Sequence, residues 1–167
     1  MTPLFEELID RHHDEIFCYL WRLLGKARRS EVSLETEDLV QDVFMRAYEA
    51  FPKLRPDSNH RAWLYKIATN RAFTKLRRAK RERDKIALLN VANEPNNNFP
   101  APENAGANLR AAVERLTPKQ KACVSLRYFN DLDYAEIAAI VGCSALSARA
   151  NVSQAIRQLR SALKESR

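Results

Sequence analysis

The residues of this chain that could do chemistry are mainly its cations. A segment from His60 to Lys85, HRAWLYKIATNRAFTKLRRAKRERDK, begins aromatic and apolar and ends as a dense run of Arg and Lys. Cations neutralise phosphates, and aromatic rings or guanidinium planes stack on unpaired bases. A basic run alone is usually a solvated helix face, but its mixture with aromatic residues favours nucleic-acid binding.

Composition supports an anionic partner without choosing one. The 167 residues carry a formal net charge of +7, which suits nucleic acid, a membrane surface or an acidic protein. The cysteines Cys18, Cys123 and Cys143 are far apart, so we expect buried thiols in a reducing cytoplasm and not a disulfide framework or zinc site. The sequence shows no secretory signal and no stretch near the ~20 apolar residues of a membrane span. We therefore expect a cytoplasmic protein without a membrane partner.

Enzyme chemistry has no convincing set of residues in this sequence. We find no paired-carboxylate, Ser-His-Asp or phosphate-loop constellation, and we predict no cofactor and no enzyme activity. The run HHDE, from His12 to Glu15, suggests a metal site. Adjacent His residues point about 100° apart on a helix and lack the i, i+4 spacing of a zinc pair. We interpret this run as a surface cluster and predict no metal.

Helical spacing of apolar residues recurs along the chain, and only 3 glycines interrupt it. In the N-terminal half we expect one helix from Pro3, with Thr2 as N-cap, to near Gly25. A second helix should start after Thr36 and stop before Pro52. The third should be capped by Asn59 or Ser58 and continue to about residue 85.

Beyond an Asn- and Pro-rich linker, the C-terminal half contains capping signals at regular intervals. A short helix at 109–116 precedes Thr117 as N-cap, with Pro118 at the first helical position. Asp133 and Glu136 form a capping box for a helix ending at Gly142. A last helix should run from Ser144 to about residue 164. We predict an all-α fold of two small helical domains, 1–88 and 108–167, joined by a flexible linker, 89–107.

The last two helices fit a helix-turn-helix, in which a short helix, a tight turn and a longer helix pack together. Their apolar residues can pack on one another, which leaves a polar outer face for a DNA major groove. A helical hairpin used only for packing is the alternative. The residues of the outer face are Ser144, Ser147, Arg149, Ala150, Ser153 and Gln154.

Three segments in this order resemble bacterial sigma factors of the sigma-70 family. They are DLVQDVF, RAWLYKIATNRAFTKLRR and LTPKQKACVSLRYFNDLDYAEIAAIVGCS. The short form, with only the second and fourth conserved regions, is similar to the extracytoplasmic-function (ECF) group. The resemblance implies a factor that binds core RNA polymerase, recognises the minus-ten and minus-thirty-five promoter elements and promotes DNA melting.

The resemblance also implies roles for particular residues. The helix that docks on polymerase corresponds to Asp38, Gln41, Asp42, Phe44 and Arg46. The loop 52–59 corresponds to the one that captures a flipped base. The residues for the minus-ten single strand are Asn59, Trp63, Lys66, Asn70, Arg71, Lys75, Arg77 and Arg78. Those for the minus-thirty-five element are Ser144, Ser147, Arg149, Ala150, Ser153, Gln154 and Arg157.

The implied partners are the polymerase core, through the clamp of its largest subunit and the flap region, promoter DNA, and an anti-sigma factor. The sequence departs from the family in its last helix, where SALSARANVSQAIRQLR is poor in cations. Fewer phosphate contacts imply weaker electrostatic anchoring to duplex DNA. A stand-alone helix-turn-helix regulator that does not bind polymerase is the alternative function; it would not need the DLVQDVF helix.

Overall fold

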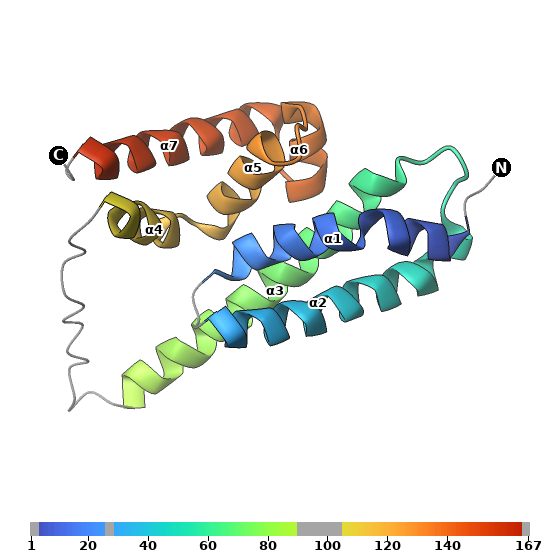
Figure 1. The fold of residues 1–167 in the computed structure, drawn as a ribbon, viewed down its shortest axis with the longest axis horizontal. Helices are drawn as coiled ribbons and strands as arrows, with labels where there is room; N and C mark the ends of the chain where they lie inside the picture. The colour runs from blue at the N-terminus through green and yellow to red at the C-terminus, as the bar shows by residue number, and fades with distance from the viewer. Residues whose placement is uncertain (1–3, 26–28, 90–104, 165–167) are drawn as a thin grey trace.

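The computed structural model describes residues 4–25, 29–89 and 105–164, and the elements in these ranges are all helical. Seven α-helices and one short 3-10 helix, η1, follow one another in the described ranges (Figure 1). Their bounds are α1 Phe5–Leu24, α2 Arg29–Ala50, η1 Phe51–Lys53, α3 His60–Leu89, α4 Ala105–Arg115, α5 Pro118–Tyr128, α6 Tyr134–Val141 and α7 Ala145–Lys164.

The N-terminal unit consists of α1, α2 and α3, which pack side by side (Figure 1). Each helix presents an apolar stripe to the other two, including Ile16 and Leu20 of α1, Val43 of α2, and Leu64 and Ala68 of α3. These side chains are almost fully buried. Burial of each Val, Leu or Ile among them contributes about 1.5–3 kcal/mol to the free energy of folding. The far half of α3 extends beyond this bundle into solvent.

Two predicted helix starts in this unit are wrong. Helix α1 begins at Phe5 with Leu4 as its N-cap, not at Pro3; Thr2 and Pro3 lie outside the described residues. Helix α2 begins at Arg29, so Thr36 is an interior residue and is fully buried. Its burial against the neighbouring helices outweighs the preference of Thr for a helix end.

The C-terminal unit confirms the predicted caps. Gln120 N–H donates to the Thr117 hydroxyl at 3.2 Å, and Glu136 N–H donates to Asp133 Oδ1 at 2.8 Å. Gly142 ends α6 in the left-handed conformation, with φ 76°, which an L side chain adopts at a cost. Helices α6 and α7 therefore form the predicted helix-turn-helix. Helix α4, however, begins at Ala105, earlier than position 109 and within the predicted linker.

The two units are in contact. The prediction of two domains joined by a flexible linker did not include this contact. Helix α6 packs on α3, and α5 packs on α1 (Figure 1). Buried apolar residues form one continuous cluster through both units. Segments far apart in sequence, such as the start of α3 and the turn between α5 and α6, are thereby brought together.

Candidate nucleic-acid and protein interfaces

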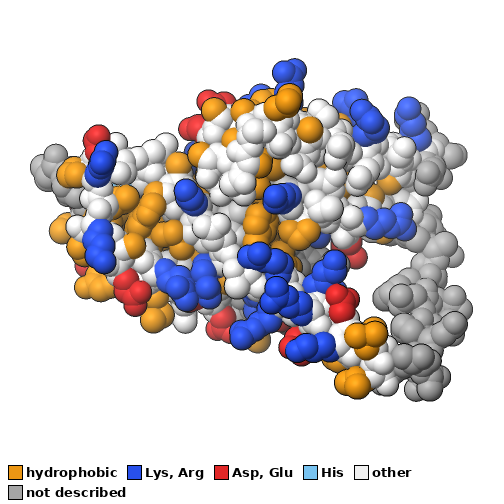
Figure 2. All heavy atoms as spheres, turned by 180° about the vertical axis from the view of Figure 1, so that it is seen from behind, with side chains coloured by type: hydrophobic (Ala, Val, Ile, Leu, Met, Phe, Trp, Pro, Cys, Tyr) orange, Lys and Arg blue, Asp and Glu red, His pale blue; other side chains and the backbone are white. Residues whose placement is uncertain are grey.

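The basic half of α3 is the most exposed part of the described chain. From Arg77 to Leu89 every residue is exposed, and the space-filling view shows Lys and Arg side chains gathered along this helix (Figure 2). Lys66 and Asn70, closer to the bundle, are also exposed. Because exposed cations on one helix can contact successive phosphates, this surface suits a nucleic-acid backbone. Arg77 and Arg78 lie where the prediction requires them, at the surface.

Two of the predicted strand-binding cations are instead engaged with α2. The Arg71 guanidinium donates to Asp42 Oδ2 at 2.5 Å, and Arg46 donates to Asp42 Oδ1 at 3.2 Å. Lys75 Nζ lies 3.9 Å from Glu35 Oε2. The structure therefore brings together Asp42, predicted to face polymerase, and Arg71, predicted to face DNA. These ion pairs hold α3 against α2, so Arg71 and Lys75 serve the fold of the unit.

The aromatic residues of α3 are less accessible than the sequence suggested. Tyr65 is fully buried, and its ring meets that of Tyr19 edge-on with centroids 5.1 Å apart. Burial raises the pKa of the Tyr65 hydroxyl. Trp63 is half-buried and packs against the core cluster. Tyr65 is therefore not one of the exposed aromatic residues that the mixture of rings and cations in this segment suggested, because this side of α3 faces the C-terminal unit.

Asn59 caps α3, as the sequence indicated. Its Oδ1 accepts from the Ala62 N–H at 3.0 Å. The capping bond uses the Oδ1 atom, while the residue as a whole stays exposed. Asn59 therefore fixes where the loop after η1 ends and where α3 begins.

The predicted polymerase-contacting residues fall into two sets. Asp38, Gln41 and Arg46 are exposed on α2, whereas Phe44 is only 8% exposed. The Phe44 ring stacks on His13 of α1, with centroids 6.1 Å apart. Phe44 therefore packs mainly within the N-terminal unit, although it also lines a shallow groove between α1 and α2.

Sequence reasoning missed two apolar side chains on the same face of α2. Met45 is 66% exposed and Tyr48 is 65% exposed. Together with Gln41 and Phe5 they line a shallow groove of about 510 Å³ between α1 and α2. Exposed large apolar groups beside polar ones are typical of a protein contact. The signal in the sequence was their position one and two turns after Gln41.

The outer face of α7 is solvent-exposed as predicted. Ser144 caps the helix, since its hydroxyl accepts from the Ser147 N–H at 3.1 Å. The Ser144 hydroxyl also donates to that of Ser147 at 2.9 Å. These two residues are therefore partly engaged with one another, and Arg149 is the first cation of the face. Every residue of the set predicted for the minus-thirty-five element is exposed: Ser144, Ser147, Arg149, Ala150, Ser153, Gln154 and Arg157.

The remaining candidate residues behave differently from the predictions. His12 is buried, not part of a surface cluster, and its Nδ1 lies 2.5 Å from Glu15 Oε1. Cys18 is exposed, against the expectation of buried thiols. Cys123 is buried, and burial raises the pKa of its thiol to about 12. Within residues 4–25, 29–89 and 105–164, no cluster of three or more His, Cys, Asp or Glu could hold a metal.

A search of the described helices for a membrane span found none with the length and apolar character to cross a bilayer.

Two family models match the chain in the order of its two units. The model described as Sigma-70 region 2 matches residues 8–82, which cover α1, α2 and most of α3. The model described as Sigma-70, region 4 matches residues 106–159, which include the helix-turn-helix.

Curated relatives of this chain are sigma factors by name. The ECF RNA polymerase sigma-E factor of Escherichia coli K12 is 30% identical over 151 residues, covering 82% of this chain and 78% of the relative. ECF RNA polymerase sigma factor SigE of Mycolicibacterium smegmatis is 29% identical and covers 95% of this chain. The chain spans 61% of the length of that relative.

Two solved structures share the fold of the chain. One is the sigma factor RpoE in complex with the anti-sigma factor NepR from Bartonella quintana, with a TM-score of 0.73, 24% identity and 98% of each chain covered. The other is CnrH in complex with the cytosolic domain of CnrY, with a TM-score of 0.64 and 24% identity. It covers 98% of this chain and 89% of that one.

Proposed function

We propose, on the premise that this chain belongs to the sigma-70 family and to its ECF group, that it is a sigma factor for transcription initiation. It binds core RNA polymerase, recognises the minus-ten and minus-thirty-five elements and promotes melting. It performs no bond chemistry itself, and it acts in the cytoplasm with polymerase and DNA as partners. The observation that carries this proposal is the presence, in one chain, of both matched regions in order.

Each interface has a place in this proposal. The face of α2 with Asp38, Gln41 and the exposed Met45 and Tyr48 docks on the clamp of the largest polymerase subunit. The basic half of α3 holds the backbone of the opened strand. The outer face of α7 lies in the major groove of the minus-thirty-five element, and the C-terminal unit also meets the flap region. Captured bases offset the stacking energy lost on melting, about 1.4 kcal/mol per step.

Run-off transcription with purified polymerase core, with and without this chain, tests the proposal. We expect promoter-specific transcripts only when the chain is added. A stand-alone helix-turn-helix regulator would bind duplex DNA but would neither co-purify with core nor start transcription. Absence of both core binding and transcripts would therefore favour the regulator, which the match to Sigma-70 region 2 makes the weaker alternative.

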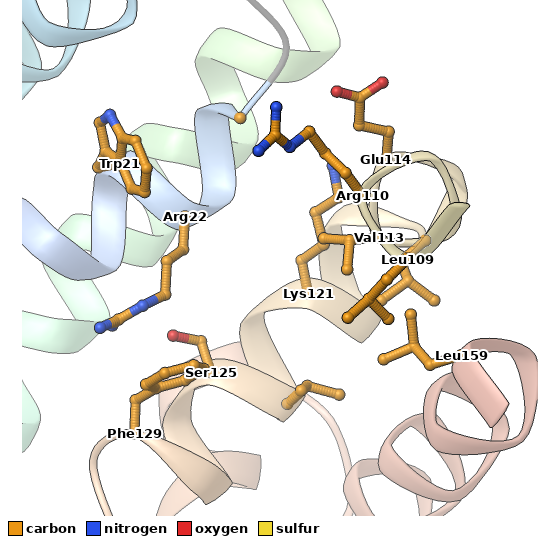
Figure 3. A pocket seen from close by; sticks show the side chains of 13 residues that line it. Trp21, Arg22, Leu109, Arg110, Val113, Glu114, Lys121, Ser125, Phe129 and Leu159 are labelled. Carbon is orange, nitrogen blue, oxygen red and sulfur yellow. The ribbon is translucent and has the colours of Figure 1, made fainter. Parts of the chain in front are cut away.

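An anti-sigma factor is the proposed regulator, since one structure of the same fold holds the sigma factor RpoE with the anti-sigma factor NepR. Between the units lies an apolar groove of about 940 Å³, with Trp21 of α1 on one side and Val113 and Leu159 of α4 and α7 on the other (Figure 3). Arg22 and Arg110 contribute positive charge at the groove. This lining fits an amphipathic helix that carries acidic residues beside its apolar face.

Substitution within the groove tests this assignment. Val113 is exposed, so Val113→Glu should be tolerated by the fold while placing a charge against the incoming apolar face. We expect a purified anti-sigma factor to inhibit run-off transcription at least ten times less effectively with this variant. Transcription without inhibitor should be unchanged. Equal inhibition of variant and wild type would show that the anti-sigma factor does not bind in this groove.

A further inference from the structure

The groove between the two units has the size of a small-molecule site. Helix α5 packs on both α1 and α7, and α4 packs on α7. The groove of about 940 Å³ lies over α5, with α1 on one side and α4 and α7 on the other (Figure 3). Ligand sites in proteins commonly enclose about 300–1,000 Å³ and are lined mostly by apolar groups, with a few polar groups that orient the ligand. The groove therefore has room for a ligand much smaller than a protein partner.

The walls of this groove offer apolar surface to a ligand. Trp21, Val113 and Phe129 line it and are exposed. Leu109 and Leu159 also line it and are half-buried. Exposed apolar groups gathered around a hollow are typical of a binding site. An alkyl tail placed between these walls would lose contact with water, as would the walls themselves.

One end of the groove holds polar groups that the fold leaves without a polar partner. Ser125 is only 3% exposed, and within the described structure its hydroxyl makes no hydrogen bond. Phe129 lies one turn later on α5, since its N–H donates to the Ser125 carbonyl at 2.9 Å. The Arg22 guanidinium lies over the Phe129 ring, with Cζ 3.9 Å from the ring centroid, and it has no carboxylate partner among the described residues. Figure 3 shows Arg22 and Phe129 pointing toward one another, with Ser125 beside them.

An unpaired buried hydroxyl is uncommon and costs free energy, so it calls for a physical explanation. A ligand oxygen that accepts from Ser125 would supply one. The exposed Phe129 ring lies beside that hydroxyl, and a rotation of this side chain would open Ser125 to the groove.

The charges around the groove favour an anion. Arg22, Arg110 and Lys121 line it, against one carboxylate, that of Glu114, among the described lining residues. A guanidinium also matches the geometry of a carboxylate, which it can hold through two parallel hydrogen bonds. Apolar walls and a positive end together suit a molecule that is apolar along its length and anionic at one end.

We propose that this groove binds a small amphipathic carboxylate. Its alkyl tail lies between Val113 and Leu159 on one side and Trp21 on the other. Its carboxylate accepts from Arg22 and Ser125. The consequence for regulation rests on the proposed function: a ligand between these walls excludes the amphipathic helix of the anti-sigma factor, so the ligand relieves inhibition.

Calorimetric titration of the full chain with hexanoate, octanoate and decanoate, each below its micelle concentration, tests the binding. Each added methylene group should strengthen binding about 4-fold. Decanol and decyltrimethylammonium carry the same tail without the negative charge, and they should bind at least ten times more weakly than decanoate. The fluorescence of Trp21 should shift to shorter wavelength as its ring loses water, and Trp21→Phe should remove that shift.

Two substitutions locate the ligand. Ser125→Ala removes a hydroxyl that has no partner, so the melting temperature should not fall, yet the affinity for decanoate should drop about 3- to 10-fold. Val113→Glu places a negative charge against the tail and should abolish binding. Arg11 is exposed on α1 and does not line the groove, so Arg11→Ala should bind decanoate as the wild type does. If Ser125→Ala and Val113→Glu also matched the wild type, decanoate would not lie in this groove and the proposal would be wrong.

A competition experiment separates this inference from the proposed function. Decanoate at ten times its Kd should raise the anti-sigma concentration needed for half-inhibition of run-off transcription roughly tenfold. If the wild type directs transcription but binds none of the alkyl carboxylates, the small-molecule site is refuted while the sigma function stands. Binding to vesicles of phosphatidylglycerol without binding to decanoate would also refute it. Decanoate binding by a chain that directs no transcription would instead refute the function and support the site.

Discussion

Asp42 shows how one residue can match a family position and serve another role. The resemblance assigns it to polymerase docking, but its carboxylate accepts from both Arg46 and Arg71 and is about one-third exposed. Asp38, one turn earlier on the same helix, is exposed. Asp42 therefore joins α2 to α3, while Asp38 belongs to the surface available for a partner.

Charge reversal at these two positions should give different results. Asp38→Lys should weaken core binding about 5- to 10-fold, equivalent to ~1 kcal/mol, while the melting temperature stays unchanged. Asp42→Lys should also lower thermal stability, because it leaves Arg46 and Arg71 without their shared carboxylate. A core-binding titration beside a thermal melt of each variant separates the effects. Asp38 would not be a docking residue if its reversal left core affinity unchanged.

The Glu15 carboxylate makes the stability of the fold depend on pH. Burial raises the pKa of its carboxyl group, but hydrogen bonds from Arg61 and His12 outweigh burial and hold the pKa below the usual 4.5. A carboxylate with a lowered folded-state pKa contributes stability above its unfolded pKa and loses it as pH falls through the folded value. We expect Glu15→Gln to cost about 1 kcal/mol at pH 7, since the side chain is partly exposed.

This cost should shrink below pH 4.5, as protonation removes the same charge from the wild type. Urea unfolding at pH 7, 5 and 3.5 measures the difference in free energy between the two proteins. A difference that did not decrease with pH would show that the Glu15 charge does not stabilise the chain.

At the scale of elements, the sequence predicted best where the determining groups are local. The boundaries of α5, α6 and α7 follow from Thr117, Asp133, Gly142 and Ser144, each of which bonds or turns within a few residues. The start of α2 was not predictable in this way. Thr36 can cap a helix or lie within one, and only its burial against other helices decides.

The division of α3 into a bundled half and a projecting half leads to a prediction about strand capture. Lys66, Arg77 and Arg78 are exposed, so replacing all three with Ala should impair promoter opening while the melting temperature stays within about 1–2 °C, as expected for surface changes. Permanganate reactivity of promoter thymines in the holoenzyme measures the opening. Normal reactivity would exclude this surface from strand binding.

The matched triple variant replaces Asn70, Arg71 and Lys75 with Ala. Arg71 and Lys75 pair with acidic residues of α2. This variant should therefore have a lower thermal stability and should also impair promoter opening. The comparison distinguishes cations that contact DNA from cations that hold α3 in place.

At the scale of the whole molecule, contact between the units was beyond the reach of local patterns. Tyr65 and Asn130 are separated by 65 positions in sequence, and neither residue type announces such a pair. The sequence did indicate the two units, the basic helix and the polar face of α7. It could not show that the Tyr65 side of α3 is covered by the second unit, because an aromatic residue suits a core and a base-stacking surface equally well.

The distribution of charge over the molecule predicts which unit dominates binding to duplex DNA. The exposed face of α7 offers Arg149 and Arg157 among mostly small or uncharged residues, whereas the far half of α3 is densely basic and exposed. Each phosphate contact contributes about 0.9 to the slope of log affinity against log salt. In the full chain without polymerase, Ala at Arg77, Arg78 and Arg81 together should reduce that slope by up to about 2.7, and Arg149→Ala by at most about 0.9.

Fluorescence anisotropy with a labelled promoter duplex, titrated at several salt concentrations, measures both slopes, with Arg11→Ala as the control that should change neither. In the holoenzyme we expect the opposite ranking for sequence selectivity, with Arg149→Ala having a larger effect than the α3 triple variant. Arg149→Ala should reduce discrimination of the minus-thirty-five element, since a good base contact contributes ~1–3 kcal/mol, while the α3 variant should weaken all promoters alike. If Arg149→Ala reduced the salt slope more than the triple variant, α7 and not α3 would be the principal contact of the free chain with the DNA backbone.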